Sequence, residues 1–364
     1  MKRFMALLLA VIVMNGAVAQ EVVEHEQHAF PQDVPAGGYS GITWLGESKY
    51  AVVSDNGDDG FFIFDIQLDS LGEITSVKNL GFYGNGDKNH DNEGIALFTP
   101  NNTLFISGEK DNAVREFDLN GKTTGRSLKM PEVFAGASRA YSLEALTYNS
   151  VTHRFWTTSE STLPADGQRA DATNGVANRL RLAAFDDSLN LVAQFPYVMD
   201  TSIEAIDAIE TIDAIENTGE IKFENFAFGV SALAALDNGK VLVLEREFAV
   251  PESKLGAYVN CKIYEVNPDL KSVRKECHKC DGKEGNHDCK GKPAVLQWDR
   301  PLEKTLVAEW MTAIGLLDFS LANYEGMCLG PKLPDGGQTL ILISDSQNQY
   351  ANILADYFKS FVIR

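Results

Sequence analysis

Acidic side chains recur at one point of a repeated pattern in this chain, directly before a short apolar run. The segments "NEGIALF", "LEALTY" and "YEGMCL" place Glu93, Glu144 and Glu325 there, and Asn92 and Asn323 lie beside them. A carboxylate at the entrance of a buried strand is unfavourable unless a partner satisfies it. Carboxylate and amide oxygens suit a hard cation, Ca²⁺ above all and Mg²⁺ less well.

A second set of charged residues follows the next apolar run of each segment: Asp55, Glu109, Glu160, Glu245 and Asp345. In an antiparallel hairpin the start of one strand lies beside the end of the next. We therefore expect Glu93 beside Glu109, and Glu325 beside Asp345. Such a ring of like charges needs positive partners, because neighbouring carboxylates raise one another's pKa. Either a bound cation or four nearby basic residues could supply them: Lys110, Arg139, Arg179 and Arg246.

Five segments share one sequence pattern: a polar residue, a small residue, an apolar strand, a turn and a second apolar strand. They span residues 39–57, 92–112, 143–161, 230–248 and 324–347. A third and a fourth strand follow in most of them, and four antiparallel strands per repeat are typical of propeller blades. We predict an all-β fold, a β-propeller of five or six four-stranded blades around a central channel. A β-sandwich is the alternative, but it does not explain the recurring acids.

The ends of the predicted propeller leave two questions open. Residues 22–30 or the C-terminal "FKSFVIR" could supply a closing strand. A sixth, degenerate blade could follow Tyr197 or Lys271, where we expect insertions near 200–224 and 271–300.

Composition and the N-terminus indicate export. The 364-residue chain carries a net charge of −19, which argues against nucleic acid or an anionic membrane as a partner. A basic start, an apolar run and "AVA" predict a signal peptide over residues 1–19, with no cysteine after it for a lipid anchor. The apolar run is too short to span a membrane. We expect one domain over 20–364, in the periplasm or outside the cell.

One polar loop concentrates cysteine and histidine. Cys277, Cys280, His287 and Cys289 have a spacing that could bind zinc. An exported protein favours disulfides instead, with Cys261 as a fourth cysteine and Cys328 as a free thiol in the core.

The five segments together resemble the phytase-like family of secreted bacterial proteins, named for an "esterase-like activity of phytase". The segments "GVSALAALDNGKVLVLEREF" and "NYEGMCLGPKLPDGGQTLILISDSQ" are the most specific. The resemblance implies a propeller that hydrolyses phosphoesters or other esters. Ser231-Ala232 departs from it, because the family often has an acid after this serine.

The resemblance also implies roles for the charged residues around the channel mouth. Six acids would bind Ca²⁺ ions: Asp55, Glu93, Glu109, Glu144, Glu325 and Asp345. Glu93, Glu144 and Glu325 would be catalytic, with His90 as a possible base, although a solvated loop histidine is the plainer interpretation of His90. Lys110, Arg139, Arg179 and Arg246 would bind a small-molecule ester or phosphoester.

Two alternatives remain at this stage. A serine-esterase site is poorly supported, because "GGYSGI" around Ser40 lacks the G-x-S-x-G elbow. A non-enzymatic binding propeller with a structural cation is the alternative to a hydrolase.

Overall fold

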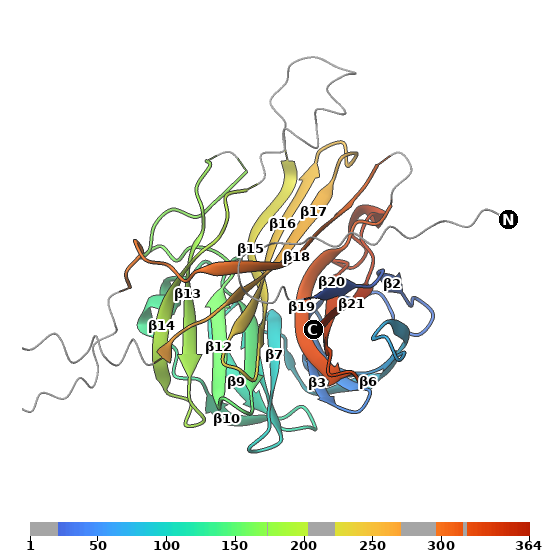
Figure 1. The fold of residues 1–364 in the computed structure, drawn as a ribbon, viewed down its shortest axis with the longest axis horizontal. Coiled ribbons are helices and arrows are strands. Elements are labelled where there is room, and N and C mark those ends of the chain that lie inside the picture. The colour runs from blue at the N-terminus through green and yellow to red at the C-terminus, as the bar shows by residue number, and fades with distance from the viewer. Residues whose placement is uncertain (1–20, 173, 203–222, 271–295, 316–318) are drawn as a thin grey trace, which may run out of the picture.

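The chain folds into a β-propeller of five four-stranded antiparallel blades, which confirms the predicted all-β architecture and sets the blade number at five (Figure 1). The computed structural model describes residues 21–172, 174–202, 223–270, 296–315 and 319–364. The predicted signal peptide, the cysteine loop and most of the predicted insertion near 200–224 lie outside these residues. Within them, no helix is long and apolar enough to cross a membrane.

Each blade is one sheet whose strands follow the chain from the channel outward. Blade 1 has β3 (Tyr39–Gly46), β4 (Lys49–Ser54), β5 (Asp58–Leu68) and β6 (Ile74–Lys88). Blade 2 has β7 (Asn92–Phe98), β8 (Thr103–Gly108), β9 (Ala113–Phe117) and β10 (Thr123–Ser127). Blade 3 has β11 (Leu143–Asn149), β12 (Arg154–Ser159), β13 (Arg179–Phe185) and β14 (Leu191–Val198). Blade 4 has β15 (Phe223–Ala235), β16 (Val241–Pro251), β17 (Tyr258–Val266) and β18 (Lys304–Ala313).

Blade 5 joins the two ends of the described chain. It contains β19 (Asn323–Lys332), β20 (Gln338–Asp345) and β21 (Tyr357–Ile363), and its outer edge is formed by β1 (Val22–Glu24) and β2 (His28–Ala29). Both predicted closing segments are therefore used, because the C-terminal strand pairs with the N-terminal one, Val22 opposite Ile363. Figure 1 shows the red end of the chain beside the blue start. Two short 3-10 helices, η1 (Glu132–Gly136) and η2 (Tyr350–Asn352), lie in connecting loops.

The second strand of each blade is buried along almost all of its length because it packs between two neighbouring blades. In β20, every residue from Thr339 to Asp345 is buried, and in β16 burial extends from Val241 to Val250. Aromatic pairs close the gap between blades: the ring centroids of Phe105 and Phe155 are 4.7 Å apart. Burial of each such side chain stabilises the fold by roughly 1.5–3 kcal/mol. The core is thus a set of layers between blades that surrounds the channel.

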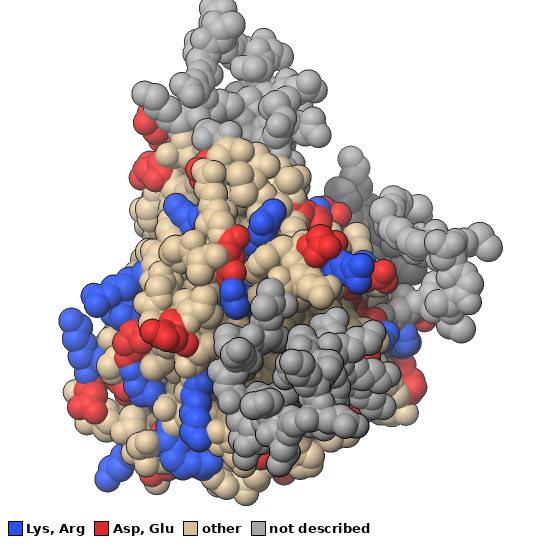
Figure 2. All heavy atoms as spheres, turned by 90° about the vertical axis from the view of Figure 1, so that its left-hand side faces the viewer, with Lys and Arg blue, Asp and Glu red and all other residues tan. Residues whose placement is uncertain are grey.

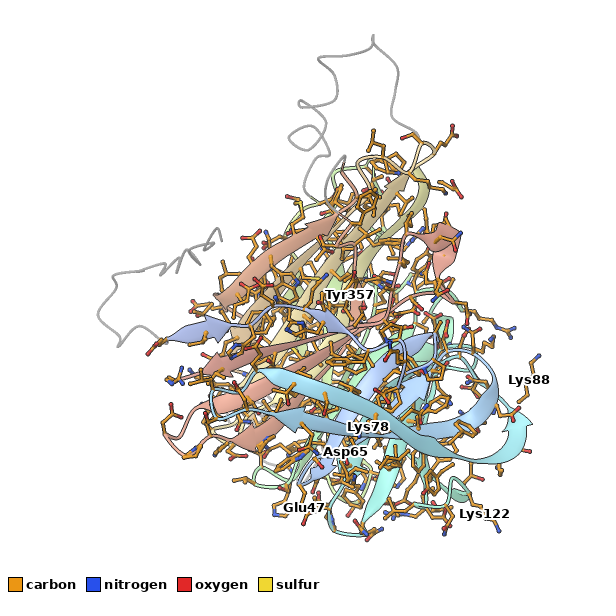
Figure 3. The ribbon with its side chains drawn as sticks, turned by 90° about the vertical axis from the view of Figure 1, so that its right-hand side faces the viewer. Glu47, Asp65, Lys78, Lys88, Lys122 and Tyr357 are labelled. Atoms are coloured by element: carbon orange, nitrogen blue, oxygen red, sulfur yellow. The ribbon has the colours of Figure 1, made fainter. Side chains whose placement is uncertain are left out.

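The outer strands of the blades carry charged side chains together with some exposed apolar ones, such as Leu80 and Phe82 on β6. Figure 3 shows β6 running along the outer edge of blade 1, with Lys78 and Lys88 on it. Lysine on an edge strand opposes pairing with another chain. Figure 2 shows basic and acidic side chains interspersed on another face of the molecule. The chemistry-bearing residues lie instead around the channel.

Candidate functional site

A β-bulge marks the same position in the inner hairpin of all five blades. In blade 3, Leu143 pairs with Ser159 and Ala145 pairs with Thr158, so Glu144 has no opposite residue of its own. The pairing shifts in the same way at Ser40, at Glu93–Gly94, at Ser231 and at Glu325. A bulge twists a strand locally and turns a side chain away from the regular alternation. This device explains why a polar residue recurs at the mouth of each inner strand.

The residue after each bulged position is small because the inner strands lie very close together. A Cβ atom on Gly41 would lie 2.2 Å from the backbone oxygen of Glu93, and one on Gly94 would lie 2.6 Å from that of Glu144. Alanine occupies the position in blades 3 and 4, as Ala145 and Ala232. The Glu-Gly pairs of the sequence are therefore a requirement of inter-blade packing as well as a source of carboxylates.

The five inner strands enclose a channel that is almost completely filled. Its cavity is about 10 Å³, roughly the space for one water molecule. The bulged polar residues line it together with an apolar layer two residues further on: Ile42, Ile95, Leu146, Leu233 and Met327. Glu93, Glu144 and Glu325 therefore converge on one cavity, as predicted. A substrate cannot enter a space of this size, so any chemistry takes place at the mouth.

Three buried carboxylates form the tightest group at the mouth. Glu93, Glu109 and Glu144 each offer one oxygen, and these oxygens lie within 4.8 Å of one another. Their side chains are buried, with 7–8% exposed. Glu109 accepts a hydrogen bond of 2.6 Å from the Ser142 backbone N–H. The carboxylates of Glu93 and Glu144 accept no hydrogen bond from the described residues.

The pKa values of these three carboxylates are raised above their ordinary values. Burial, and then the charges of Glu325 and Glu109, raise the pKa of Glu93 well above its ordinary value. Burial and the neighbouring Glu93 do the same to the pKa of Glu144. Burial raises the pKa of Glu109 to about 8, although the bond from Ser142 acts in the opposite direction. The arrangement therefore favours protons or a cation between these side chains.

The other side of the mouth holds a second group of acids. Burial, then the charge of Glu325, raise the pKa of Asp55 to about 7. Burial and the same neighbour raise the pKa of Asp345 well above its ordinary value. Asp55 is half-buried and accepts a hydrogen bond of 2.5 Å from the Asn56 side chain. Asp55 is therefore more exposed than Asp345 and lies at the rim of the mouth.

Arg246 is the internal cation of the ring. Its side chain is 3% exposed and donates to both Glu160 and Glu325, and to Asn323 at 3.1 Å. Burial lowers its pKa, but the charges of Glu325 and Glu160 outweigh that effect and raise the pKa above its usual range. Among the described residues, the ring thus has one buried arginine for seven carboxylates: Asp55, Glu93, Glu109, Glu144, Glu160, Glu325 and Asp345. The excess of negative charge remains large.

The strand register corrects one expected member of the ring. Gly229 pairs with Arg246, and Val230 pairs with Glu245. Arg246 therefore takes the place that acids hold in the other blades, and Glu245 lies one residue before it. Glu245 accepts a hydrogen bond of 2.5 Å from the Tyr197 hydroxyl and forms an ion pair of 2.8 Å with Lys304. It joins blade 3 to blade 4 and does not contribute to the ring.

The remaining predicted residues lie at or beyond the rim. Lys110 forms an ion pair of 3.1 Å with Asp91, and its charge acts on Asp55. The imidazole of His90 lies 3.0 Å from Asp111 and is partly exposed. Arg139 is exposed in the loop before β11.

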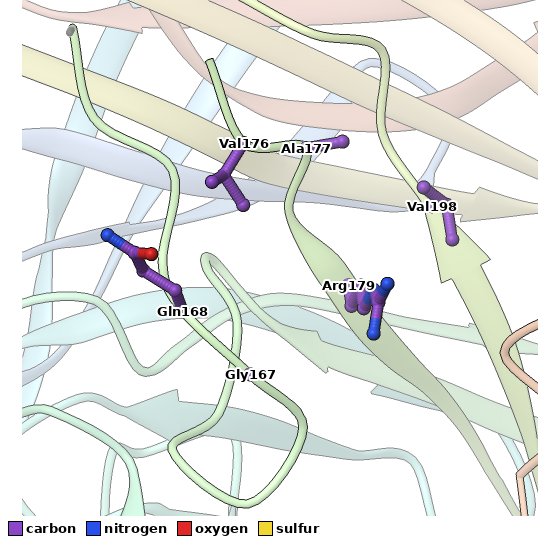
Figure 4. Close-up of a pocket in the computed structure, with 6 residues that line it drawn as sticks. All are labelled: Gly167, Gln168, Val176, Ala177, Arg179 and Val198. Atoms are coloured by element: carbon purple, nitrogen blue, oxygen red, sulfur yellow. The ribbon is translucent and has the colours of Figure 1, made fainter. Parts of the chain in front are cut away.

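Arg179 lines a separate pocket of about 300 Å³ on blade 3 (Figure 4). Gly167, Gln168, Val176, Ala177 and Val198 complete its lining. The pocket lies at the mouth end of the blade, because Arg179 begins β13 beside the strand that ends before Glu160. Neighbouring strands are about 5 Å apart, so the pocket is one strand outward from the ring.

Sequence patterns missed two residues at the mouth, Tyr141 and Arg169. The Arg169 guanidinium carbon lies 3.8 Å from the centroid of the Tyr141 ring. Both belong to irregular loops, where no periodic signal identifies a position.

The two described cysteines are free and buried in the core. Cys261 and Cys328 form no disulfide. Cys261 therefore does not staple the cysteine loop, as one interpretation required. The zinc and disulfide alternatives for that loop concern residues outside the described part of the chain.

The fold and the site define the class of the protein: a five-bladed propeller with an acidic channel mouth and a buried arginine. The family model described as "Phytase-like: Esterase-like activity of phytase" matches residues 34–347. The chain therefore belongs to the phytase-like family. No curated protein matches it.

Several solved structures match the chain at low similarity. An endo-arabinase from Bacteroides thetaiotaomicron is 10% identical, with 90% of this chain and 94% of that chain covered and a TM-score of 0.42. A gluconolactonase from Xanthomonas campestris is 9% identical, with coverages of 90% and 86% and a TM-score of 0.35. A virginiamycin B lyase from Staphylococcus aureus is 12% identical, with coverages of 90% and 67% and a TM-score of 0.32. At these values the similarities say nothing about activity.

Proposed function

We propose that the protein is an exported, metal-assisted hydrolase of phosphoesters or other esters that works at the channel mouth. One observation carries the proposal: Glu93, Glu109 and Glu144 bring their oxygens within 4.8 Å of one another in a buried site. The carboxylates of Glu93 and Glu144 accept no hydrogen bond from the described residues, so their oxygens remain available to an ion. Oxygens bound to one ion at about 2.4 Å can be at most about 4.8 Å apart. The group therefore fits a single hard cation, and Ca²⁺ suits an all-oxygen set best.

The chain's own residues divide the remaining work. A cation held by Glu93, Glu109 and Glu144 would polarise a phosphoryl or carbonyl oxygen and lower the pKa of a bound water. Asp55 is the favoured proton acceptor, because its pKa of about 7 lies near physiological pH and its side chain reaches the rim. His90, tied to Asp111, is the second choice. Arg246 keeps Glu160 and Glu325 paired and thus holds the ring together.

A hydrolysis screen tests this function. Phosphomonoesters, phosphodiesters and carboxyl esters of p-nitrophenol are offered to wild type and to Glu93→Gln, with Ca²⁺ and with chelator. We expect turnover that chelator and Glu93→Gln both abolish. Glu116→Gln is the matched control, because Glu116 is also buried in blade 2 but is bound to Arg126 at 2.9 Å, away from the mouth. It should stay active.

Other outcomes separate the alternatives. Turnover that persists in chelator contradicts the metal-assisted mechanism. A cation that stabilises the protein without turnover of any ester favours a non-enzymatic binding propeller. Export is tested separately, by the N-terminal sequence of the mature protein, which we expect to begin at Gln20.

A further inference from the structure

Arg169 lies within electrostatic reach of the acidic ring without belonging to it. Its guanidinium stacks over the Tyr141 ring, with 3.8 Å from the guanidinium carbon to the ring centroid. Burial raises the pKa of Glu160, and the positive charges of Arg246 and Arg169 both oppose that rise. Tyr141 directly precedes Ser142, whose backbone N–H donates to Glu109 at 2.6 Å, so the stacked Arg169 lies near the acidic ring, on the side where Glu160 follows the second strand of blade 3.

Buried contacts on both sides of Arg169 fix the loop that carries it. Asn178 is fully buried, and its side-chain oxygen accepts the backbone N–H of Ala170 at 3.0 Å. Arg181 binds Asp166 through two parallel hydrogen bonds of 2.6 Å. Paired hydrogen bonds between a guanidinium and a carboxylate fix orientation as well as position. The backbone at Arg169 is thus held in place before any ligand arrives.

The side chain of Arg169 has unused donors. It makes no hydrogen bond or ion pair with a described residue, in contrast to Arg246, whose guanidinium binds Glu160 and Glu325. A guanidinium carries five N–H donors in one plane and matches the oxygens of phosphate or carboxylate. Stacking on an aromatic ring leaves these in-plane donors free. Rigid placement with free donors is the arrangement expected of a prepared binding group.

We propose that Arg169, oriented by Tyr141, binds the anionic group of the substrate, so that the preferred substrates are phosphoesters and not uncharged carboxyl esters. The inference rests on the proposed hydrolase function and adds a substrate class to it. Arg169 supplies the positive charge that a phosphate needs beside a ring of carboxylates. Phosphate is preferred over a simple carboxylate because its several oxygens can meet Arg169 and the mouth of the channel together. Tyr141 acts as a positioning residue.

The test compares Arg169→Ala with Arg154→Ala, since Arg154 pairs with Asn149 beside the hairpin turn of blade 3, at the opposite end of that blade from the mouth. Titration calorimetry measures the affinity of the Ca²⁺-loaded protein for inorganic phosphate and for acetate. Steady-state kinetics measure KM and kcat for p-nitrophenyl phosphate and p-nitrophenyl acetate. We expect Arg169→Ala to weaken phosphate binding and raise KM for the phosphate ester by about tenfold or more. Turnover of the acetate ester and the affinity for Ca²⁺ should be unaffected, and Arg154→Ala should behave as wild type.

Variants of Tyr141 test the positioning role. Tyr141→Phe keeps the ring and should match wild type, whereas Tyr141→Leu should weaken phosphate binding by a smaller factor than Arg169→Ala. Unchanged phosphate affinity in Arg169→Ala, or equal losses for both esters, would overturn the inference while the proposed function stands. Phosphate binding that depends on Arg169, together with no turnover by wild type, would overturn the proposed function and the substrate assignment with it, and would leave Arg169 as an anion-binding residue only.

Discussion

Replacing Glu93 by glutamine should stabilise the protein when no cation is present and destabilise it relative to wild type when a cation is bound. Glu93 is 7% exposed and has two carboxylates nearby, those of Glu109 and Glu144, with oxygens within 4.8 Å. Glutamine has nearly the same shape but no charge. The substitution therefore removes repulsion in the cation-free protein and removes a ligand in the loaded one.

The size of the effect follows from Coulomb's law. Two unit charges 4.8 Å apart repel by about 3.5 kcal/mol at an effective dielectric constant of about 20. We take the repulsion of one carboxylate pair as the stability that Glu93→Gln gains. The second pair is left out because protonation already relieves part of the repulsion among coupled carboxylates. With an unfolding entropy of about 2.1 cal/mol/K per residue, this free energy corresponds to roughly 5 °C in the melting temperature of a 364-residue chain.

Differential scanning calorimetry at pH 8 measures this difference, first in chelator and then in saturating Ca²⁺. We expect Glu93→Gln to melt above wild type in chelator and below it in Ca²⁺. Glu116→Gln is the control, because Glu116 is 1% exposed and binds Arg126, Thr103 and Thr124. It should melt below wild type in both conditions. If Glu93→Gln lowers the melting temperature in chelator as Glu116→Gln does, the repulsion argument is wrong.

Three further predictions concern stability. Arg246→Met leaves two buried carboxylates without their cation, so the free energy of unfolding in chemical denaturation should fall by about 3–5 kcal/mol, and no change would contradict the role of Arg246. Gly41→Ala places a Cβ 2.2 Å from the Glu93 backbone oxygen and should lose about 1–3 kcal/mol, more than Ala232→Gly loses in the same denaturation experiment. The folded-state pKa of Asp55, about 7, lies above the ordinary value of 3.8, so the folded state holds this proton more tightly. The melting temperature in chelator should therefore fall as pH rises from about 4 to about 7, and a rising profile would contradict this sign.

The fold can largely be predicted from the sequence because the inner hairpins repeat. The five predicted hairpins correspond to β3–β4, β7–β8, β11–β12, β15–β16 and β19–β20. Each second strand has an apolar stretch and each turn has Gly, Asn or Pro, so local patterns and the packing between blades agree. Blade number depends on how the ends meet, and the pairing of β1 with β21 joins residues more than 300 positions apart. Local patterns do not contain that information.

The site is less accessible to sequence reasoning, for two physical reasons. Blade 4 has an arginine where the other blades have an acid, and because Glu245 directly precedes it, Glu245 was expected to hold the ring position of Arg246. The spacing did contain a signal, because Arg246 follows Ser231 by 15 residues, as Asp55 follows Ser40. Arg169 carries no comparable signal. Its place depends on tertiary contacts of an irregular loop.

The central claim is that Glu93, Glu109 and Glu144 hold one divalent cation at the channel mouth. The most direct measurement is an anomalous difference map from crystals grown with Mn²⁺ in place of Ca²⁺. We expect one peak at about 2.0–2.6 Å from an oxygen of each of the three carboxylates. A map without a peak there, in crystals at pH 8 with saturating Mn²⁺, would contradict the claim.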